Sequence, residues 1–317
     1  MKKILIFSMV VFLCLIFNET IFCQEILLHK IENGYQINID RKMYARYITN
    51  FSGTPIVWPV IGPSERLMTR QFPMSEEDKS EKHDHPHHRS LWFNHDGVNG
   101  NRHWMKSPIV HQEFLKAESN GKIAILVTKN HWLDETSGNV VCSDIRTLKF
   151  GVIPDVKVRY IDFDVTVTAE QEKVTFADTK EGSFGIRVPS SMDVDAKKGG
   201  GIVNAQGDKN DAAWGKRSDW VDYSGPADGA TVGITGMNHP DSFRYPTYWH
   251  VRTYGLLAAN PFGVSAFEND KSKSGELVLK KGESFTLMYR ILFHDGSPQS
   301  LDIPKFFREY AASHIEK

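Results

Sequence analysis

Apolar and polar residues that alternate along the chain constrain its fold more than any other feature. From Ile161 to Val167 the odd positions are apolar and the even positions are Asp or Thr. Successive side chains of a β-strand point to opposite faces of a sheet, so this pattern predicts a strand with one buried face. Several such runs are spread over the 317 residues, which indicates a mostly β protein.

The alternation changes parity just before this run. Val156, Val158 and Tyr160 alternate with a lysine and an arginine, so the apolar positions are even up to Tyr160 and odd from Ile161. An extra residue in one strand of a pair produces such a change. We therefore predict a β-bulge, or a kink between two strands, at Tyr160–Ile161.

Two turn signals predict hairpins. Ser119-Asn120-Gly121 and Lys280-Lys281-Gly282-Glu283 each separate strand-like runs with residues that favour tight turns. The flanking runs are 114–117 and 122–128 for the first turn, and 277–279 and 285–293 for the second. Residues 232–235 and 263–267 are predicted to add further short strands.

The C-terminal segment is the part with a helical pattern. Asp302-Ile303-Pro304 supplies residues typical of a helix start, and apolar residues recur at helical spacing from Phe306 to about Ile315. We predict an all-β fold, a large antiparallel two-sheet sandwich of the supersandwich type with this short C-terminal helix, in a single domain over residues 24–317. A two-domain β protein is the alternative.

Residues 1–23 have the layout of a secretory signal peptide. Two lysines precede an apolar run from Ile4 to Phe17, which is too short for a stable transmembrane anchor. We expect cleavage before Gln24 and export to the periplasm or the extracellular space, with a lipid anchor on Cys23 as the alternative. No later run is apolar enough to cross a bilayer, so we expect no transmembrane segment in the mature chain.

The charge balance and the cysteines exclude several classes of partner and site. The 38 basic and 39 acidic residues nearly cancel, so we expect no nucleic-acid partner. Cys142 is the single cysteine outside the signal segment, which leaves no internal disulfide to form. Its neighbours are apolar, so we predict a buried, inert thiol.

Histidines gather in one segment. Six of the thirteen lie between His83 and His103, and three of these six are in Asp84-His85-Pro86-His87-His88-Arg89. In an extended chain His83, His85 and His87 would project to one side and His88 to the other. We predict an edge or loop here, because Pro86 cannot donate to a sheet ladder. No cofactor is predicted; a divalent metal on these three histidines is one alternative, and a solvated loop is the other.

Two further segments carry side chains suited to binding a sugar. Asp178 to Arg187 holds four charged residues beside two glycines, and it reads equally well as a charged turn. Pro246 to Gly255 interleaves aromatic rings with His and Arg, as stacking on a sugar ring and binding its hydroxyls require. The stretches Asn238-His239-Pro240 and Trp214 to Gly225 have a similar composition.

We predict that the loop His85 to Arg89, the block Asp178 to Arg187 and His250 with Arg252 meet in one cleft. None of these segments alone contains both a proton-transfer pair and enough groups to orient a polyol. The catalytic candidates are His88 or His250 as acid, and Glu181 or Asp178 as base. The candidates for binding the substrate are His85, His87, Arg89, Lys180, Arg187, Trp249, Arg252 and Tyr254. Trp249 would stack on the sugar if exposed and fill the core if buried.

The blocks Asp84 to Phe93, Asp178 to Gly182 and Tyr248 to Arg252 together resemble an exported bacterial family labelled "methane oxygenase PmoA-like". The resemblance runs from about Arg46 to Phe293, and its label implies a metal-dependent oxygenase. More loosely, the chain is similar to the galactose-mutarotase-like supersandwich proteins. That similarity implies a large β-sandwich and proton transfer on sugars by a histidine and a carboxylate in an open cleft.

These patterns favour an exported carbohydrate-active protein that uses histidine and carboxylate groups on a sugar. An epimerase, a lyase and a hydrolase all fit, and the ligand would be a small molecule or an oligosaccharide. A non-catalytic carbohydrate-binding module and the metal-dependent oxygenase are the alternatives. The sequence leaves open the sugar, its linkage, the reaction and the oligomeric state.

Overall fold

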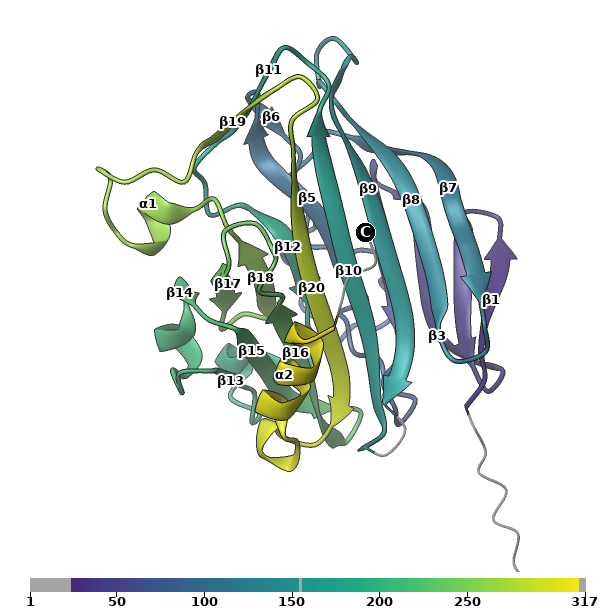
Figure 1. Cartoon of the computed structure of the whole chain (residues 1–317). Helices are drawn as coiled ribbons and strands as arrows, with labels where there is room; N and C mark the ends of the chain where they lie inside the picture. Colours follow the sequence, from purple (N-terminus) through teal and green to yellow (C-terminus); the bar gives the residue numbers. More distant parts are fainter. Residues whose placement is uncertain (1–23, 154–155, 314–317) are drawn as a thin grey trace, which may run out of the picture.

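Two large antiparallel sheets make up the computed structural model, which describes residues 24–153 and 156–313. The predicted signal peptide, residues 1–23, lies outside the described residues. Figure 1 shows the smaller sheet in front, with helix α2 (Ile303–Ala311) across it and the larger sheet behind. The predicted all-β, two-sheet sandwich with a short C-terminal helix is confirmed.

The larger sheet has twelve strands within the described ranges. Its main path runs β1 (Ile26–Ile31), β2 (Gly34–Ile39), β3 (Lys42–Phe51), β4 (Thr54–Val60), β5 (Leu91–Val98), β12 (Gly182–Arg187), β18 (Leu256–Asn260), β17 (Tyr248–Arg252) and β14 (Lys216–Arg217). Three short strands extend it beside β5: β6 (Asn101–Arg102), β11 (Lys173–Phe176) and β19 (Leu277–Lys280).

The smaller sheet has eight strands in the described part of the chain. In spatial order they are β13 (Gly201–Asn204), β15 (Trp220–Ala227), β16 (Ala230–Asn238), β20 (Ser284–Asp295), β10 (Val158–Ala169), β9 (Val140–Ile153), β8 (Ala124–Leu133) and β7 (Ile109–Ser119). Short helical turns lie in the connections: η2 (Ser190–Met192), η3 (Val194–Ala196), η4 (Asn210–Ala213), α1 (Val264–Phe267) and η5 (Pro298–Ser300).

The main core fills the space between the two sheets. Phe163 of β10 packs on Phe184 of β12 with ring centroids 5.1 Å apart, and Phe184 stacks on Tyr289 of β20 at 5.0 Å. All three rings are buried, and burial of each such side chain stabilises the fold by about 1.5–3 kcal/mol. Cys142 of β9 is also buried, as predicted, and burial raises the pKa of its thiol.

The predicted bulge at Tyr160–Ile161 is wrong. Strand β10 keeps an unbroken register with β9 and with β20 across these residues. The parity of the apolar residues changes because β10 has two apolar environments. Ile161 and Phe163 face the core between the sheets, whereas Val158 and Tyr160 face a second apolar cluster on the outer side.

Helix α2 covers that second cluster. Ile303, Phe306 and Tyr310 are its buried residues, and they pack with Val158 of β10 and Leu292 of β20. Asp302 caps the helix by accepting a hydrogen bond from the backbone N–H of Lys305 at 3.0 Å. The helix was predicted to reach about Ile315, but it ends at Ala311.

Of the two predicted hairpins, one is confirmed. Strands β7 and β8 pair across the turn at residues 119–121. The turn at Lys280–Glu283 instead joins β19 of the larger sheet to β20 of the smaller one. The backbone N–H of Glu283 donates to the Lys280 carbonyl at 2.9 Å, and such a turn forms equally at a hairpin or at a corner between sheets.

Of the two predicted short strands, residues 232–235 lie in β16. Residues 263–267 do not form a strand: 264–267 make the single helical turn α1, whose Phe267 ring packs on Tyr248 and Trp214. The run is apolar because Phe267, although it lies in a loop, packs its ring against residues of the sheet.

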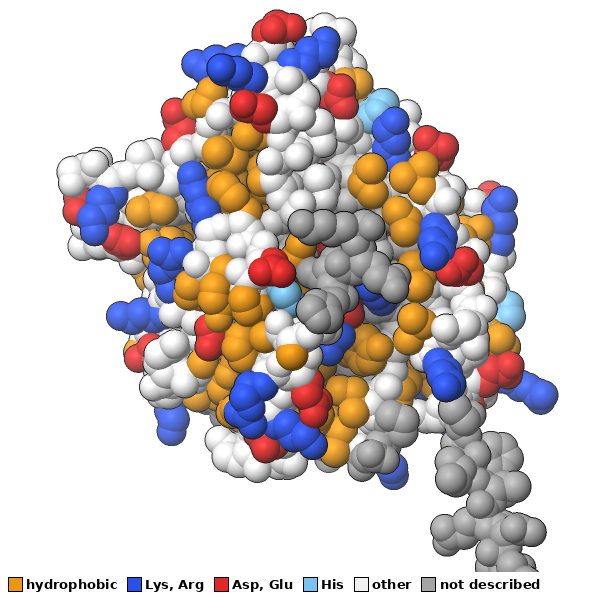
Figure 2. All heavy atoms as spheres, viewed as in Figure 1, with side chains coloured by type: hydrophobic (Ala, Val, Ile, Leu, Met, Phe, Trp, Pro, Cys, Tyr) orange, Lys and Arg blue, Asp and Glu red, His pale blue; other side chains and the backbone are white. Residues whose placement is uncertain are grey.

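The face shown in Figure 2 mixes hydrophobic side chains with charges of both signs.

We expect loss of the α2 contact to destabilise the protein measurably. Phe306→Ala should lower the free energy of unfolding by about 3 kcal/mol, since it leaves a cavity between the helix and the sheet. Glu309→Ala, on the exposed side of the same helix, should change it by less than about 0.5 kcal/mol. Denaturant titration of both variants checks this, and equal effects would contradict the packing described.

Candidate functional site

The outer face of the larger sheet carries the side chains predicted to form a site. Along β5, β12 and β17 the inward residues enter the main core, and the residues between them face outward. Trp92, Arg187 and His250 are outward residues of three different strands. Trp92 joins Trp104 and Leu256 in a small apolar cluster on this face, which loops cover in place of a second sheet.

The histidine segment forms a turn on this face. The N–H of His88 donates to the carbonyl of His85 at 2.8 Å, and His85 has a left-handed backbone with φ of 48°. The loop prediction is therefore confirmed, but the extended-chain geometry is wrong. Because the chain folds back at Pro86, the rings of His85 and His87 both pack against His88, at 4.9 and 4.4 Å between centroids.

A network of ion pairs, built on the fully buried side chains of Arg70, Arg187 and Asp193, attaches this turn to the sheet. One carboxylate oxygen of Asp84 accepts from Arg70 and from Arg187, both at 2.7 Å. Arg70 also donates to Asp193 at 2.8 Å, and Lys82 reaches the other oxygen of Asp193 at 3.0 Å. Burial would raise the pKa of Asp84, but Arg187, His85 and Arg70 together hold it below its ordinary value.

A glycine makes room for this network. Gly255 follows β17 with φ of 99°, a conformation that side chains rarely adopt. A Cβ atom there would lie 2.3 Å from an oxygen of Asp193 and 3.0 Å from a nitrogen of Arg70. The turn that carries Tyr254 therefore approaches the ion pairs as closely as the backbone allows.

The three predicted segments come together on this face. Arg187 donates a long hydrogen bond to Nδ1 of His88 at 3.4 Å, and His85 stacks on Tyr254 at 4.7 Å. His250 lies against the second segment, with its Nδ1 2.7 Å from the carbonyl oxygen of Lys180. These contacts bring side chains that are far apart in the sequence together on one face, and their function as a site stays a prediction.

Neighbouring groups fix the tautomers of the two buried histidines. His88 must accept at Nδ1, because arginine can only donate, so its proton is on Nε2. His250 must donate at Nδ1 to a carbonyl, so its Nε2 is left with a free lone pair. The pair therefore offers one N–H donor and one basic nitrogen.

Burial keeps these imidazoles neutral. Desolvation lowers the pKa of His250 to about 4, with further lowering from Lys180 and Arg252. Desolvation and Arg187 lower the pKa of His88 well below its usual value, and burial lowers that of His87 to about 4. Near pH 7 neither catalytic candidate carries the proton that an acid would donate as an imidazolium.

The two candidate carboxylates occupy different environments. The Glu181 side chain is 31% exposed at the rim, 3.5 Å from Lys180, whose own side chain is 47% exposed. Asp178 instead accepts hydrogen bonds from the backbone and hydroxyl of Ser265 and from the N–H of Gly275, at 2.7–3.0 Å. These three bonds hold the loop after β18, so Glu181 is the better placed carboxylate.

Trp249 fills the core. It is 1% exposed, and its indole N–H donates to the Ser218 carbonyl at 2.8 Å, so it cannot stack on a ligand. Trp214 and Tyr254 supply half-buried rings at the site instead. The guanidinium of Arg252 lies 5.9 Å from the centre of Trp214 and 5.4 Å from that of Tyr254.

Sequence reasoning missed several contributors. Arg70 and Asp193 had no local signal, because only the fold brings them to Asp84. Asp96 of β5 was also missed: burial raises its pKa, nearby Glu181 adds to this, and one of its oxygens has no partner. A half-buried carboxylate in such a position is typical of functional sites.

Other predicted groups lie elsewhere or apart. His83 stacks on Phe72 at 4.5 Å rather than joining His85 and His87. Within residues 24–153 and 156–313, no group of three His, Cys, Asp or Glu side chains is arranged to hold a metal ion. His239 packs on Tyr310 of helix α2, so the stretch 238–240 belongs to the smaller sheet.

Arg89 is buried beside this cluster. It is 6% exposed, and one of its nitrogens lies 3.5 Å from the Met105 carbonyl.

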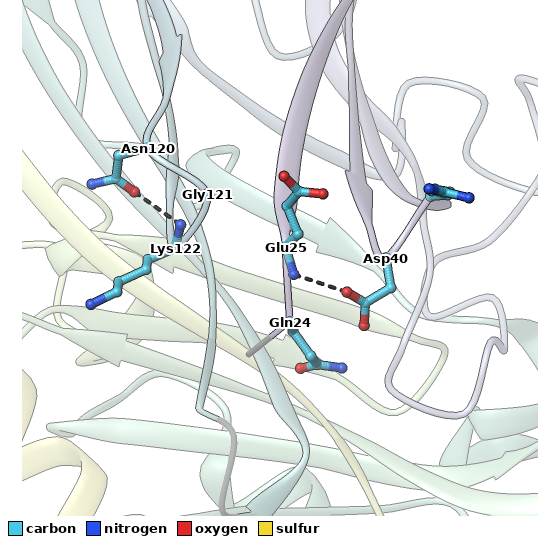
Figure 3. A pocket seen from close by; sticks show the side chains of 7 residues that line it. Gln24, Glu25, Asp40, Asn120, Gly121 and Lys122 are labelled. Atoms are coloured by element: carbon cyan, nitrogen blue, oxygen red, sulfur yellow. Dashed lines mark hydrogen bonds between the residues drawn. The ribbon is translucent and has the colours of Figure 1, made fainter. Parts of the chain in front are cut away.

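A separate shallow hollow lies at the edge of the larger sheet and contains none of the predicted site residues (Figure 3). Gln24, Asp40 and Lys122 are among the residues that line it. None of the described helices is long and apolar enough to cross a membrane.

The chain is a two-sheet β-sandwich with a cluster of polar and aromatic side chains on the outer face of its larger sheet. Residues 35–308 match the profile of a family described as "Family of unknown function (DUF6807)", and the chain belongs to this family. No curated protein matches the sequence significantly. The PmoA-like resemblance stays a prediction.

Several solved structures resemble this one at low sequence identity. A GH36 α-galactosidase from Geobacillus stearothermophilus has a TM-score of 0.44 at 11% identity over 86% of this chain, which spans 42% of that enzyme. Galactose mutarotase-like proteins from Lactobacillus casei and Clostridium acetobutylicum have TM-scores of 0.42 and 0.41 at 10% identity. They are matched over 85% and 86% of this chain and 100% and 99% of their own.

We expect the ion-pair network to be essential for stability. Asp193→Asn removes the fully buried negative charge between Arg70 and Lys82, and it should lower the free energy of unfolding by about 3 kcal/mol. Asp195→Asn is the matched control, two residues away and exposed. Urea unfolding distinguishes them, and an unchanged midpoint for Asp193→Asn would rule out this role.

The buried neutral histidines should make stability depend on pH. Because the pKa of His250 is near 4 in the folded protein and about 6.5 when unfolded, the unfolded chain takes up a proton first as the pH falls. Stability is therefore complete above about pH 6.5 and decreases down to about pH 4. His250→Gln should reduce this decrease by up to about 3 kcal/mol, measured by unfolding at pH 7.0 and 4.5; parallel pH profiles would contradict it.

Proposed function

We propose that this protein is a carbohydrate-active enzyme that moves protons on a sugar, with His250 as the base. The observation that carries the proposal is the state of this imidazole, which is neutral and has its free lone pair on Nε2. A positioned neutral imidazole accepts a proton from a reacting group. The sugar class remains part of the proposal, as does export.

The surrounding groups suit a polyol. Tyr254 and Trp214 offer ring faces, Nε2–H of His88 offers a hydrogen bond, and Glu181 stands at the open rim as a second proton-transfer group. The predicted roles are thereby revised: a neutral His250 suits a base better than the acid first assigned to it. Glu181 keeps the role of the carboxylate partner.

The test can also favour either of two other functions. A carbohydrate-binding module would use the same rings without any need for a basic nitrogen. The oxygenase implied by the PmoA-like label would require iron or copper, so metal analysis of the purified protein accompanies the assay. Stoichiometric iron or copper together with oxygen-dependent turnover would replace the present proposal.

The assay follows proton exchange. A panel of neutral and acidic monosaccharides and their methyl glycosides is incubated with the protein in D₂O, and incorporation of deuterium at carbon is followed by NMR. We expect at least one sugar to exchange or epimerise at a rate that depends on the protein. Binding without exchange for every bound sugar would favour the binding module.

Substitutions assign the roles. His250→Gln, His88→Ala and Glu181→Gln should each lower turnover by at least about 100-fold while the circular dichroism spectrum is unchanged. Asp178→Asn should mainly lower the melting temperature, because its carboxylate holds the Ser265–Gly275 loop. Turnover lost in Asp178→Asn at unchanged stability, with Glu181→Gln fully active, would reverse the assignment of the carboxylate.

A further inference from the structure

Two arginines of the candidate site have no carboxylate partner among the described residues. Arg89 is 6% exposed, its Nε has no hydrogen-bond partner, and its closest acceptor is the Met105 carbonyl at 3.5 Å. Arg252 contacts the rings of Trp214 and Tyr254. A buried cation without a counter-ion is costly, and burial lowers the pKa of Arg89 to about 10.

Arg187 and Arg252 share one aromatic ring. Their guanidinium carbons lie 5.1 and 5.4 Å from the centre of Tyr254. Arg187 has one carboxylate, Asp84, which it shares with Arg70, and its Nε is buried without a partner. Two cations therefore converge on one ring. The two carboxylates that also act on this ring, Asp84 and Glu181, lie next to further cations, Arg70 and Lys180.

Other unsatisfied groups nearby are mostly donors as well. The indole N–H groups of Trp92, Trp104 and Trp214 are buried without an acceptor. Trp92 and Trp104 pack on His88, and Trp214 packs on His250. A site with an excess of N–H donors and of positive charge is complementary to anionic oxygen atoms.

We propose that the ligand of this site carries a carboxylate, so that the sugar is a uronic acid or a glycoside of one. This inference rests on the proposed function for the place and for the sugar. It adds that Arg252 binds the acid group, while the buried guanidinium groups of Arg187 and Arg89 add positive charge around the histidine turn. The planar guanidinium fork matches a carboxylate with two parallel hydrogen bonds, a geometry that a single hydroxyl cannot provide.

The chemistry of a uronic acid suits the base that the site contains. The C5–H bond of a uronate is next to the carboxylate, so its proton can move to Nε2 of His250 while the electron pair enters the carboxylate as an enediolate. Return of a proton to C5 restores the C–H bond, with deuterium incorporated in D₂O. A carboxylate beside Arg252 also offsets a charge that lowers the pKa of His250, which makes that nitrogen a better base.

Binding is measured by calorimetry with matched sugars. The probes are the methyl glycosides of D-galacturonate and D-glucuronate, their neutral twins methyl galactoside and methyl glucoside, and methyl galactoside 6-sulfate. We expect a uronate to bind at least about tenfold more tightly than its neutral twin, and added salt to weaken it. The sulfate arm distinguishes a planar carboxylate from a tetrahedral anion.

Arg252→Gln should weaken uronate binding by about 10- to 100-fold and leave the neutral twin nearly unaffected. The matched control is Arg41→Gln, which removes the same charge from an exposed turn between β2 and β3. Arg89→Lys, which keeps the buried charge but loses the fork, serves as a second variant. Thermal melts confirm that each variant is folded.

The outcomes separate the two proposals. Four results would each overturn the carboxylate inference: neutral twins that bind as tightly as uronates, a preference for the sulfate, no uronate binding, and uronate binding unaffected by Arg252→Gln. Uronate binding that depends on Arg252, but without His250-dependent exchange at C5, would keep this inference and overturn the enzymatic function. Binding together with exchange supports both.

Discussion

One carboxylate oxygen, on Asp84, links the parts of the candidate site. It accepts from Arg70 and Arg187 at 2.7 Å each, so the histidine turn, the strand β12 and the segment before the turn are joined at a single atom. Burial of two charged guanidinium groups beside a histidine costs free energy, and the negative charge of Asp84 offsets part of this cost. Without Asp84, Arg187, which sets the tautomer of His88, would have no carboxylate partner.

The same pairing explains why the histidines of this site differ from a metal-binding or a freely titrating set. Desolvation and cationic neighbours keep His87, His88 and His250 neutral, and hydrogen bonds from opposite kinds of group give His88 and His250 opposite tautomers. The two rings therefore present one N–H donor and one acceptor nitrogen. Charge for binding an anion is then left to the arginines, which do not titrate near neutral pH.

The fold class followed from alternation in the sequence, because one-sided burial of a strand leaves a direct trace in residue type. The meeting of three segments was also predictable, from the complementary chemistry of their side chains. What escaped prediction depends on long-range packing. The parity change at Tyr160 reflects the helix α2 over β10 rather than a bulge, and the turn at Lys280–Glu283 joins two sheets rather than two strands of one. Likewise, the residues near Asp193 in the sequence do not indicate that this carboxylate pairs with Arg70.

A bond inside the sandwich has a mechanical consequence for the site on its outside. Arg146 of β9, fully buried and paired with Asp144, donates to the carbonyl of Phe93 in β5 at 3.3 Å. This hydrogen bond joins the two sheets at the residue next to Trp92, whose ring stacks on His88. Moving this part of β5 away from a ligand would break that hydrogen bond between the sheets, whereas moving the loops that cover Trp92 would leave it intact. We therefore expect the shape of the candidate site to adapt through its loops and not through the sheet beneath them.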